Sequence, residues 1–341
     1  MTTQDQLHLV SVRIDTVPAH PREADVTIGI DESLGDALVR ITLDQFDIMI
    51  PALLHPDDID RGIHEARKAM KRTRALLRLV RDELGYDVYR NENVVLRDVS
   101  RNLAPVRDSD VLLRTLAAVK EIFGPSVSSH AFASTRSYLR LEHRRLRTTV
   151  VDDRQLMTDL ATTLNAARAR FSGRGRLGSQ NAGPQIRDDF RAIRGGLRRV
   201  HGRGRRGFER AVRTSDSETL HEWRKRVKYL QYQVETLSPL WPDLLDAYGA
   251  RLTTLAETLG REHDFAVLRS VIIEKPDACP DPRERSTLVA LIDHHTPHLR
   301  QEAFTLGATI YDERTKAFVE RMESYWHASR STPAAPGLSG S

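Results

Sequence analysis

Apolar residues recur at spacings of three and four in two separate stretches of the chain. The first apolar stripe consists of Ile63, Ala66, Met70, Thr73, Leu77, Val80 and Leu84, and the second of Leu220, Trp223, Val227, Leu230, Val234 and Leu237. This spacing places each set on one face of an α-helix. A long apolar face is typical of a helix packed inside a bundle, so we predict that both stripes are buried.

Each apolar stripe carries the same basic motif, His-Glu-x-Arg-Lys-x-x-Lys. The motif begins at His64 and again at His221, 157 positions later. Beside the first stripe, basic residues form an unbroken row: His64, Arg67, Lys71, Arg74, Arg78 and Arg81. Four of the chain's seven lysines occupy equivalent motif positions, namely Lys68, Lys71, Lys225 and Lys228. Because like charges on one helix face repel each other, we expect an anionic partner to compensate them.

Helical periodicity continues through almost all of the chain, which predicts an all-α fold. A Gly/Ser-rich stretch at 172–184 divides the helical region into halves at 32–171 and 185–327. Each half offers four helical stretches in the same order, so we expect an internal duplication. The third stretch is expected to be interrupted in both halves, at 105–110 and at 260–264, where Arg-x-x-Asp recurs.

The two ends of the chain have a different character. Residues 1–31 form a leader with two alternating runs, at 10–14 and 26–30, which is compatible with a short β-hairpin. Residues 328–341 are rich in Ser, Pro and Gly, and we expect this tail to be disordered. The first residues lack the pattern of a signal peptide, and no apolar run is long enough for a membrane span.

Local signals predict several turns and helix starts. Pro56-Asp57 should precede the first motif helix, and Ser215 with Glu218 has the spacing of a capping box before the second. The glycine-rich segments 173–178 and 202–207 do not follow a strand, so we interpret them as flexible basic joints rather than dinucleotide-binding loops. His294-His295-Thr296-Pro297-His298 is interpreted as a surface turn, because proline breaks helical geometry.

Charge is distributed unevenly along the chain. The formal net charge is +5, but the window from Arg187 to Lys228 contains 14 basic and six acidic residues, a local charge of +8. Guanidinium groups bind phosphate oxygens through paired hydrogen bonds, so arginine rows suit a phosphate polymer. Two further rows lie at helical spacing: Arg136, Arg140, Arg144 and Arg147, and Arg187, Arg191, Arg194 and Arg198. A shorter row, from Arg101 to Arg114, flanks the expected interruption of the third stretch.

Other kinds of chemistry have weaker support. A His-Glu-x-x-His zinc motif needs a second histidine where Lys68 and Lys225 stand, so we expect no metal site and no cofactor. Glu65 and Glu222 are better placed to pair with Lys68 and with Lys225 or Arg226 than to act as bases. Cys279 is the single cysteine, which excludes disulfides and favours a reducing cytoplasm. Aromatic residues make up only 6% of the chain, which lowers the case for nucleic-acid binding.

The repeated His-x-x-Arg-Lys-x-x-Lys motif resembles the CHAD family, α-helical domains named for their histidines. The resemblance extends over about residues 31–326 and includes Arg-Asp-x-Asp-Val at 107–111 and Leu-Gly-x-x-x-Asp at 259–264. It implies two antiparallel helical bundles related by a pseudo-twofold axis, with a basic groove between them that binds inorganic polyphosphate. The ligand contacts it implies are His64, Arg67, Lys68, Lys71, Arg74, His221, Arg224, Lys225 and Lys228. The second copy departs from the pattern at Gln231 and Glu235.

The sequence therefore predicts a non-enzymatic cytoplasmic protein that binds polyphosphate, and the resemblance adds attachment to polyphosphate granules. The leader is too short for the catalytic domain that often precedes a CHAD domain, so we expect no activity from one. The predicted site adds Arg78, Arg140, Arg144, Arg191, Arg194 and Arg198 to the contacts above. Two alternatives stay open: a metal-dependent phosphohydrolase that uses His64 and His221, and a nucleic-acid-binding protein.

Overall fold

The structure is a computed structural model that describes residues 25–55, 58–124, 127–128, 130–173 and 186–331. In this part of the chain the fold is all-α, as predicted. The helices are α1 (Leu34–Leu54), α2 (Ile59–Leu79), α3 (Arg81–Leu84), α4 (Tyr86–Asn102), α5 (Ala104–Ile122), α6 (Ala133–Val151), α7 (Arg154–Ser172), α8 (Arg191–Thr214), α9 (Ser217–Leu237), η2 (Ser238–Leu240), α10 (Pro242–Glu274), η3 (Pro276–Ala278), α11 (Pro282–Tyr311) and α12 (Thr315–Ser331).

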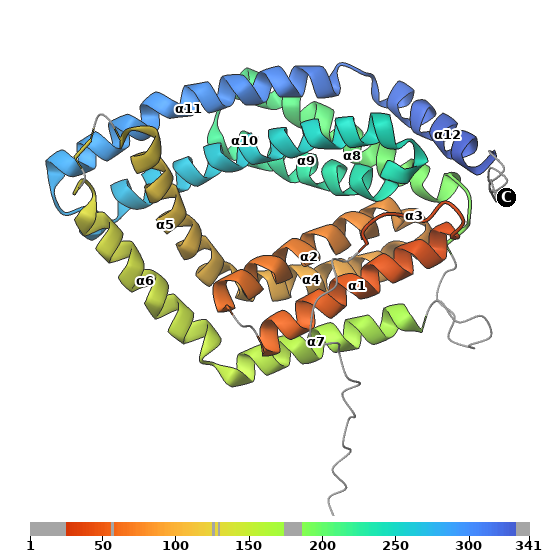
Figure 1. The fold of residues 1–341 in the computed structure, drawn as a ribbon, viewed down its shortest axis with the longest axis horizontal. Coiled ribbons are helices and arrows are strands. Elements are labelled where there is room, and N and C mark those ends of the chain that lie inside the picture. The colour runs from red at the N-terminus through yellow and green to blue at the C-terminus, as the bar shows by residue number, and fades with distance from the viewer. Residues whose placement is uncertain (1–24, 56–57, 125–126, 129, 174–185, 332–341) are drawn as a thin grey trace, which may run out of the picture.

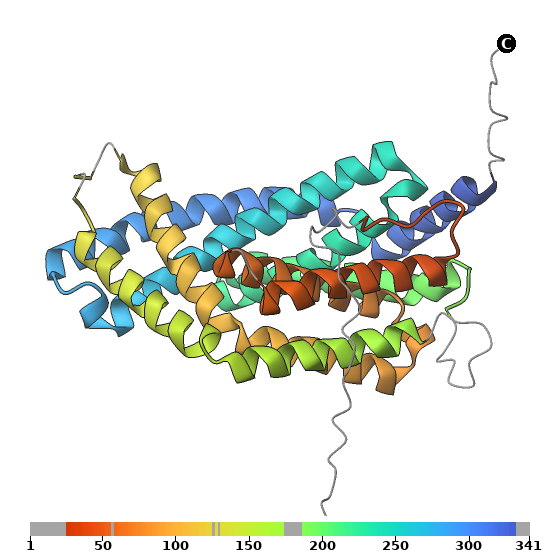
Figure 2. The ribbon, with the colours of Figure 1, turned by 60° about the horizontal axis from the view of Figure 1, so that its bottom comes forward.

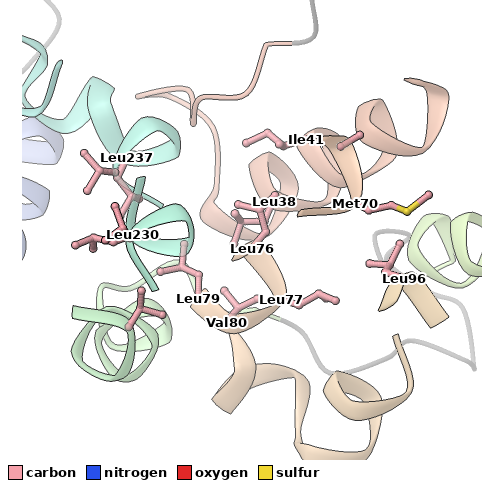
Figure 3. Packing of buried hydrophobic residues seen from close by; sticks show 14 of the residues in the cluster. Leu38, Ile41, Met70, Leu76, Leu77, Leu79, Val80, Leu96, Leu230 and Leu237 are labelled. Carbon is pink, nitrogen blue, oxygen red and sulfur yellow. The ribbon is translucent and has the colours of Figure 1, made fainter. Parts of the chain in front are cut away.

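Both predicted apolar stripes are buried, which confirms the helix faces inferred from the spacing. The second stripe lies on α9, whereas the first follows α2 to Leu77 and continues past the end of that helix through Val80 to Leu84 of α3. Helices α2 and α9 pack against each other in the middle of the molecule. Figure 3 shows leucines of α2 and α9 meeting in one core, with Leu38 of α1 and Leu96 of α4 close by. This core contains residues of both predicted halves. The division into separate domains stays a prediction.

A second, smaller core lies at one end of the molecule. It joins α5 and α6 of the first half to α10, η3 and α11 of the second, around residues such as Leu116, Phe132, Phe265 and Leu288. Figure 1 shows α5 and α6 reaching across to the ends of α10 and α11, and the turned view in Figure 2 agrees. This second contact fixes α5 relative to α10, which matters for the site described below.

Short polar side chains begin the two motif helices. Asp58 caps α2 by accepting hydrogen bonds from the backbone N–H groups of Asp60 and Arg61. Asp216 caps α9 by accepting from the backbone N–H of Thr219. The prediction that Ser215 caps α9 is therefore wrong, because the capping residue is the next one along the chain. Ser215 instead ends α8 in a left-handed conformation with φ 52°. Residues 56–57 lie outside the described part of the chain.

The third stretch is interrupted in only one half, and not at the predicted residues 105–110, which lie inside α5. In the first half the chain breaks at Leu103, and Pro105 stands in the first turn of α5, where its missing N–H costs no hydrogen bond. In the second half α10 runs without a break through 260–264, so that prediction is wrong. No proline stands at 260–264, and Gly260 is tolerated inside the helix.

Two further predicted turns are helical. The segment 202–207 lies inside α8, where a Cβ added at Gly204 would lie 2.4 Å from the hydroxyl oxygen of Tyr311. A Cβ at Gly196, two turns earlier on the same helix, would lie 2.0 Å from the carbonyl oxygen of Leu79. The glycines of α8 therefore serve close helix packing and are not joints. Likewise α11 continues through Pro297, so the surface turn expected at 294–298 is wrong.

The ends of the chain are described only in part. Residues 1–24 lie outside the described residues, and 25–33 contain no strand, so the second arm of the expected hairpin is wrong. Ile28 instead enters the helical core, and its backbone N–H donates to the carbonyl of Thr236 at the end of α9. Helix α12 runs to Ser331, into the expected tail; residues 332–341 and the linker residues 174–185 lie outside the described residues. None of the described helices is long and apolar enough to cross a membrane.

Candidate functional site

Five basic side chains gather where α2, α5, α9 and α10 approach each other. They are Arg67 and Lys71 of α2, Arg107 of α5, and Arg224 and Lys228 of α9, and we call them the central cationic cluster. The apolar stripes put α2 and α9 in contact, and the second core holds α5 against α10. The positive charges of all the other members lower the pKa of Lys71, which places Lys71 at the centre of the cluster.

Local backbone features bring two arginines into this cluster. The break at Leu103 sets the start of α5 beside α2. Arg67 of α2 therefore reaches both sides of the break: it donates to the carbonyl of Ser100 at the end of α4 and lies 3.9 Å from Asp108 of α5. On the opposite side Arg224 lies along α10, and a Cβ at Gly260 would be only 3.3 Å from its Nη2 atom. Glycine at position 260 thus makes room for this guanidinium group.

The cluster holds its charges at an energetic cost. Burial lowers the pKa of Lys71, the four neighbouring cations lower it further, and together they bring it to about 7, with Arg224 having the strongest effect among the cations. Burial also lowers the pKa values of Arg67, Arg224 and Lys228. The acidic neighbours offset this charge only in part: Asp108 beside Arg67 is mostly exposed, and burial raises the pKa of Asp264 even though Arg224 and Arg107 act in the opposite direction. Glu257 and Glu235 also lie near Lys228, but Glu235 is shared with Arg72. The cluster therefore keeps an excess of positive charge in a partly desolvated place.

Two nitrogen atoms of the cluster are buried without a hydrogen-bond partner. They are the Nε atoms of Arg67 and Arg224, which occupy equivalent positions of the repeated motif. A buried N–H group without a partner loses the hydrogen bonds that it makes with water, which costs free energy. Both arginines can therefore donate to an oxyanion that enters the cluster.

The motif histidines flank the cluster as neutral rings. His221 stacks on His263 of α10 with ring centroids 3.9 Å apart, and burial lowers the pKa of each to about 4. Burial and the positive charge of Arg107 also lower the pKa of His64. Near pH 7 the ring pair of His221 and His263 is therefore uncharged, and it offers hydrogen bonds rather than charge to a ligand.

Comparisons with known proteins place this arrangement in a family. The sequence profile of the CHAD domain matches residues 37–272, which is more than half of the chain. The chain belongs to the CHAD domain family. Among solved structures, the fold of this CHAD domain is similar to the CHAD domain from the plant Ricinus communis, with 16% identity, a TM-score of 0.56, and 91% of this chain and 98% of that chain covered.

A second similar structure is PptA from Streptomyces chartreusis. It has 17% identity and a TM-score of 0.58, with 83% of this chain and 100% of that chain covered. At such identities the likeness concerns the fold alone. No curated protein matches the sequence of this CHAD domain.

The remaining motif residues of this CHAD domain lie around the cluster. Lys68 is 3.8 Å from Glu65, and Lys225 pairs with Glu222, as predicted for the two glutamates. Both lysines are about half exposed, so they stand at the edge of the cluster. Arg74 turns toward α4, where its Nε donates to Asn93 at 3.1 Å.

The predicted arginine rows lie on other helices. Arg140 and Arg144 are exposed on α6, which packs on α5 and α7. Arg191, Arg194 and Arg198 lie on α8, and Arg194 pairs with Glu323 of α12. Arg78 points to a separate recess between α2, α4, α8 and α9. The assignment of these arginines to the ligand site stays a prediction.

Sequence reasoning missed Arg107 and His263 as members of the site. Both stand in the segments where Arg-x-x-Asp recurs, so the signal was present in the sequence. It was interpreted as a sign of duplication and of the family resemblance but not as part of the binding site, because nothing in the sequence says that α5 and α10 lie beside the motif helices. The approach of these two helices depends on the second core, which forms between distant parts of the chain.

A serine, a histidine and an aspartate also stand in a row near the start of α2. Ser109 Oγ lies 2.9 Å from His143 Nδ1, and His143 Nε2 lies 3.2 Å from Asp60 Oδ2. However, Ser109 is only 5% exposed, and its hydroxyl donates to the carbonyl of Val106. A nucleophile needs an accessible hydroxyl whose proton passes to the histidine. This row therefore ties α2, α5 and α6 together and does not form a catalytic triad.

Proposed function

We propose that this CHAD domain binds inorganic polyphosphate in the central cationic cluster without cleaving it, as a protein of polyphosphate granules. The observation that carries the proposal is the gathering of five partly buried basic side chains with an excess of positive charge. Members of this family bind polyphosphate, and that chemistry fits the cluster. A linear chain with about one negative charge per phosphate would neutralise these cations in series.

Two details support a phosphate polymer over a single anion. The unpartnered Nε atoms of Arg67 and Arg224 come from different helices, so one ligand would have to reach both. Lys68 and Lys225 flank the cluster, and they can bind phosphates on either side of it once they leave Glu65 and Glu222. In this proposal the arginines of α6 and α8 guide the chain outside the cluster.

The first test is a titration of long-chain polyphosphate at several salt concentrations. Because five cations are neutralised, the logarithm of the binding constant should fall with the logarithm of the salt concentration with a slope of about −3 to −5. Binding should therefore weaken by roughly 60-fold to 1000-fold between 50 and 200 mM salt. A slope near zero would contradict binding by charge neutralisation.

The same samples separate the alternatives. Phosphate released in the presence of Mg²⁺, Mn²⁺ or Zn²⁺ and lost with His64→Ala would favour a phosphohydrolase. Among the described residues, however, no three His, Cys, Asp or Glu side chains gather to hold a metal ion. Displacement of bound polyphosphate by DNA or RNA at equal phosphate concentration would favour a nucleic-acid partner. We expect neither result.

A further inference from the structure

A second group of cations lies in a recess away from the central cluster. Five arginines line this arginine recess: Arg78 of α2, Arg81 of α3, Arg199 and Arg203 of α8, and Arg226 of α9. The recess is partly open to solvent. Helix α8 can come this close to the end of α2 because Gly196 packs directly on the backbone of Leu79.

Acidic partners compensate only part of this charge. Asp82 lies 2.9 Å from Arg199, and Glu222 lies 3.6 Å from Arg226 while it also pairs with Lys225. Burial, together with the charges of Arg226 and Arg81, lowers the pKa of Arg203. Five guanidinium groups thus face the recess with two carboxylates beside them, which leaves an excess of about three positive charges.

Two tyrosines orient the guanidinium groups. The guanidinium carbon of Arg78 lies 4.1 Å from the ring centre of Tyr229, and that of Arg81 lies 5.0 Å from the ring centre of Tyr89. Such stacking occupies the flat face of a guanidinium group and leaves its N–H edge available. Tyr89 and Tyr229 also line the recess, so stacking and phosphate binding can take place together.

The recess differs from the central cluster in two ways. On α9, Arg226 stands two residues from both Arg224 and Lys228, which is about 200° around the helix, so it faces away from them. The recess also has no counterpart at the positions 157 residues away, where Glu235 corresponds to Arg78, Phe46 to Arg203 and Ala69 to Arg226. The recess therefore does not repeat with the motif.

We propose that the arginine recess is a second binding site, which takes one compact triphosphate group. A triphosphate presents several closely spaced negative charges, matching the excess of positive charge, and its oxygens can each meet an N–H edge. The group can belong to free inorganic triphosphate or to a nucleoside triphosphate. This site does not depend on the central cluster binding polyphosphate, because its arginines other than Arg78 lie outside the residues assigned there.

The experiment measures inorganic triphosphate binding by calorimetry on the full chain carrying Arg224→Gln and Lys228→Gln, so that the central cluster is weakened. We expect one triphosphate per chain. Adding Arg203→Gln and Arg226→Gln should weaken this binding by at least about thirtyfold. The matched control adds Arg210→Gln and Arg213→Gln, two exposed arginines of α8, and should change it less than about threefold.

Two outcomes would overturn the proposal. Equal losses in the recess variant and in the control would mean diffuse attraction to a basic surface. Triphosphate binding that survives Arg203→Gln and Arg226→Gln would place the ligand elsewhere on the chain. Circular dichroism of each variant checks that it is folded.

A titration with ATP then identifies the source of the triphosphate group. Binding as tight as that of inorganic triphosphate assigns a nucleotide, and much weaker binding assigns the inorganic ion. A failure of the recess to bind either one leaves the salt titration of long-chain polyphosphate unaffected, because that titration reports on the central cationic cluster.

Discussion

Replacing Arg224 and Lys228 by glutamine should weaken the binding of long-chain polyphosphate by at least about a hundredfold. Each side chain gives a charged hydrogen bond in a partly desolvated place, and such bonds contribute roughly 1.5–3 kcal/mol each. The double variant should fold, because α9 packs through its apolar stripe and the two lost cations repel one another. Fluorescence titration at low salt measures the change. Arg210→Gln with Arg213→Gln, on the exposed face of α8, serves as the control and should bind almost normally.

The length of the polyphosphate chain sharpens this prediction. If one chain contacts both motif helices, the second contact is effectively intramolecular, so long chains should lose more affinity than short ones. Arg67→Gln with Lys71→Gln, the pair on α2, should show the same dependence on length. Small and equal losses of affinity for long and short chains would mean that α2 and α9 carry independent surface patches. This result would contradict a single binding site formed by both helices.

Replacing Lys71 by methionine should stabilise the protein without ligand while it weakens polyphosphate binding. Burial and four neighbouring cations lower the pKa of Lys71 to about 7, well below its ordinary value of 10.5. Below pH 7 the folded protein therefore holds a buried charge that the unfolded chain carries in water. Methionine keeps the apolar stem and removes the charge, so the free energy of unfolding should rise by roughly 2–4 kcal/mol at pH 6.

The pH dependence of this gain has a definite sign. Between about pH 7 and 10.5 the unfolded state binds more protons at Lys71 than the folded state does, so the stability contribution of this group rises with pH. The advantage of Lys71→Met should therefore be largest at pH 6 and shrink as the pH rises through this range. Urea unfolding of both proteins at several pH values measures it. Lys68→Met is the control on the same helix and should give no such gain, because Lys68 is half exposed beside Glu65. A gain that is independent of pH would contradict the buried charge.

Much of the fold could be predicted because local periodicity and burial coincide. Ile63 to Leu77 on α2 and Leu220 to Leu237 on α9 each follow the spacing of one helix face, and both faces are buried in the structure. Predictions that rested on single residues were less successful. Pro297 was expected to end a helix, but the packing of α11 on α8 and α10 maintains the helix through it. Glycines at 202–207 suggested flexibility, whereas they allow α8 to pack closely.

The candidate site could be predicted where it lies on the repeated motif. Arg67 and Arg224 occupy one motif position, Lys71 and Lys228 another on the same helix face, and the structure brings all four together. Arg107 and His263 could not be assigned, because their place depends on contacts between distant helices. The arginine recess could not be predicted for the same reason: its five arginines come from four helices, and Arg203 and Arg226 belong to no common row. The internal duplication itself stays a prediction.

Lysine labelling tests the central claim most directly, because the chain contains its own controls. Four of the seven lysines belong to the motifs, and Lys275 and Lys316 are exposed elsewhere. Acylation of the full chain, followed by mass spectrometry, gives the labelling rate of each lysine with and without long-chain polyphosphate. We predict that polyphosphate slows the labelling of Lys71 and Lys228 by about tenfold or more and leaves Lys275 and Lys316 unchanged. Equal protection of all lysines, or none at Lys71 and Lys228, would contradict polyphosphate binding in the central cationic cluster.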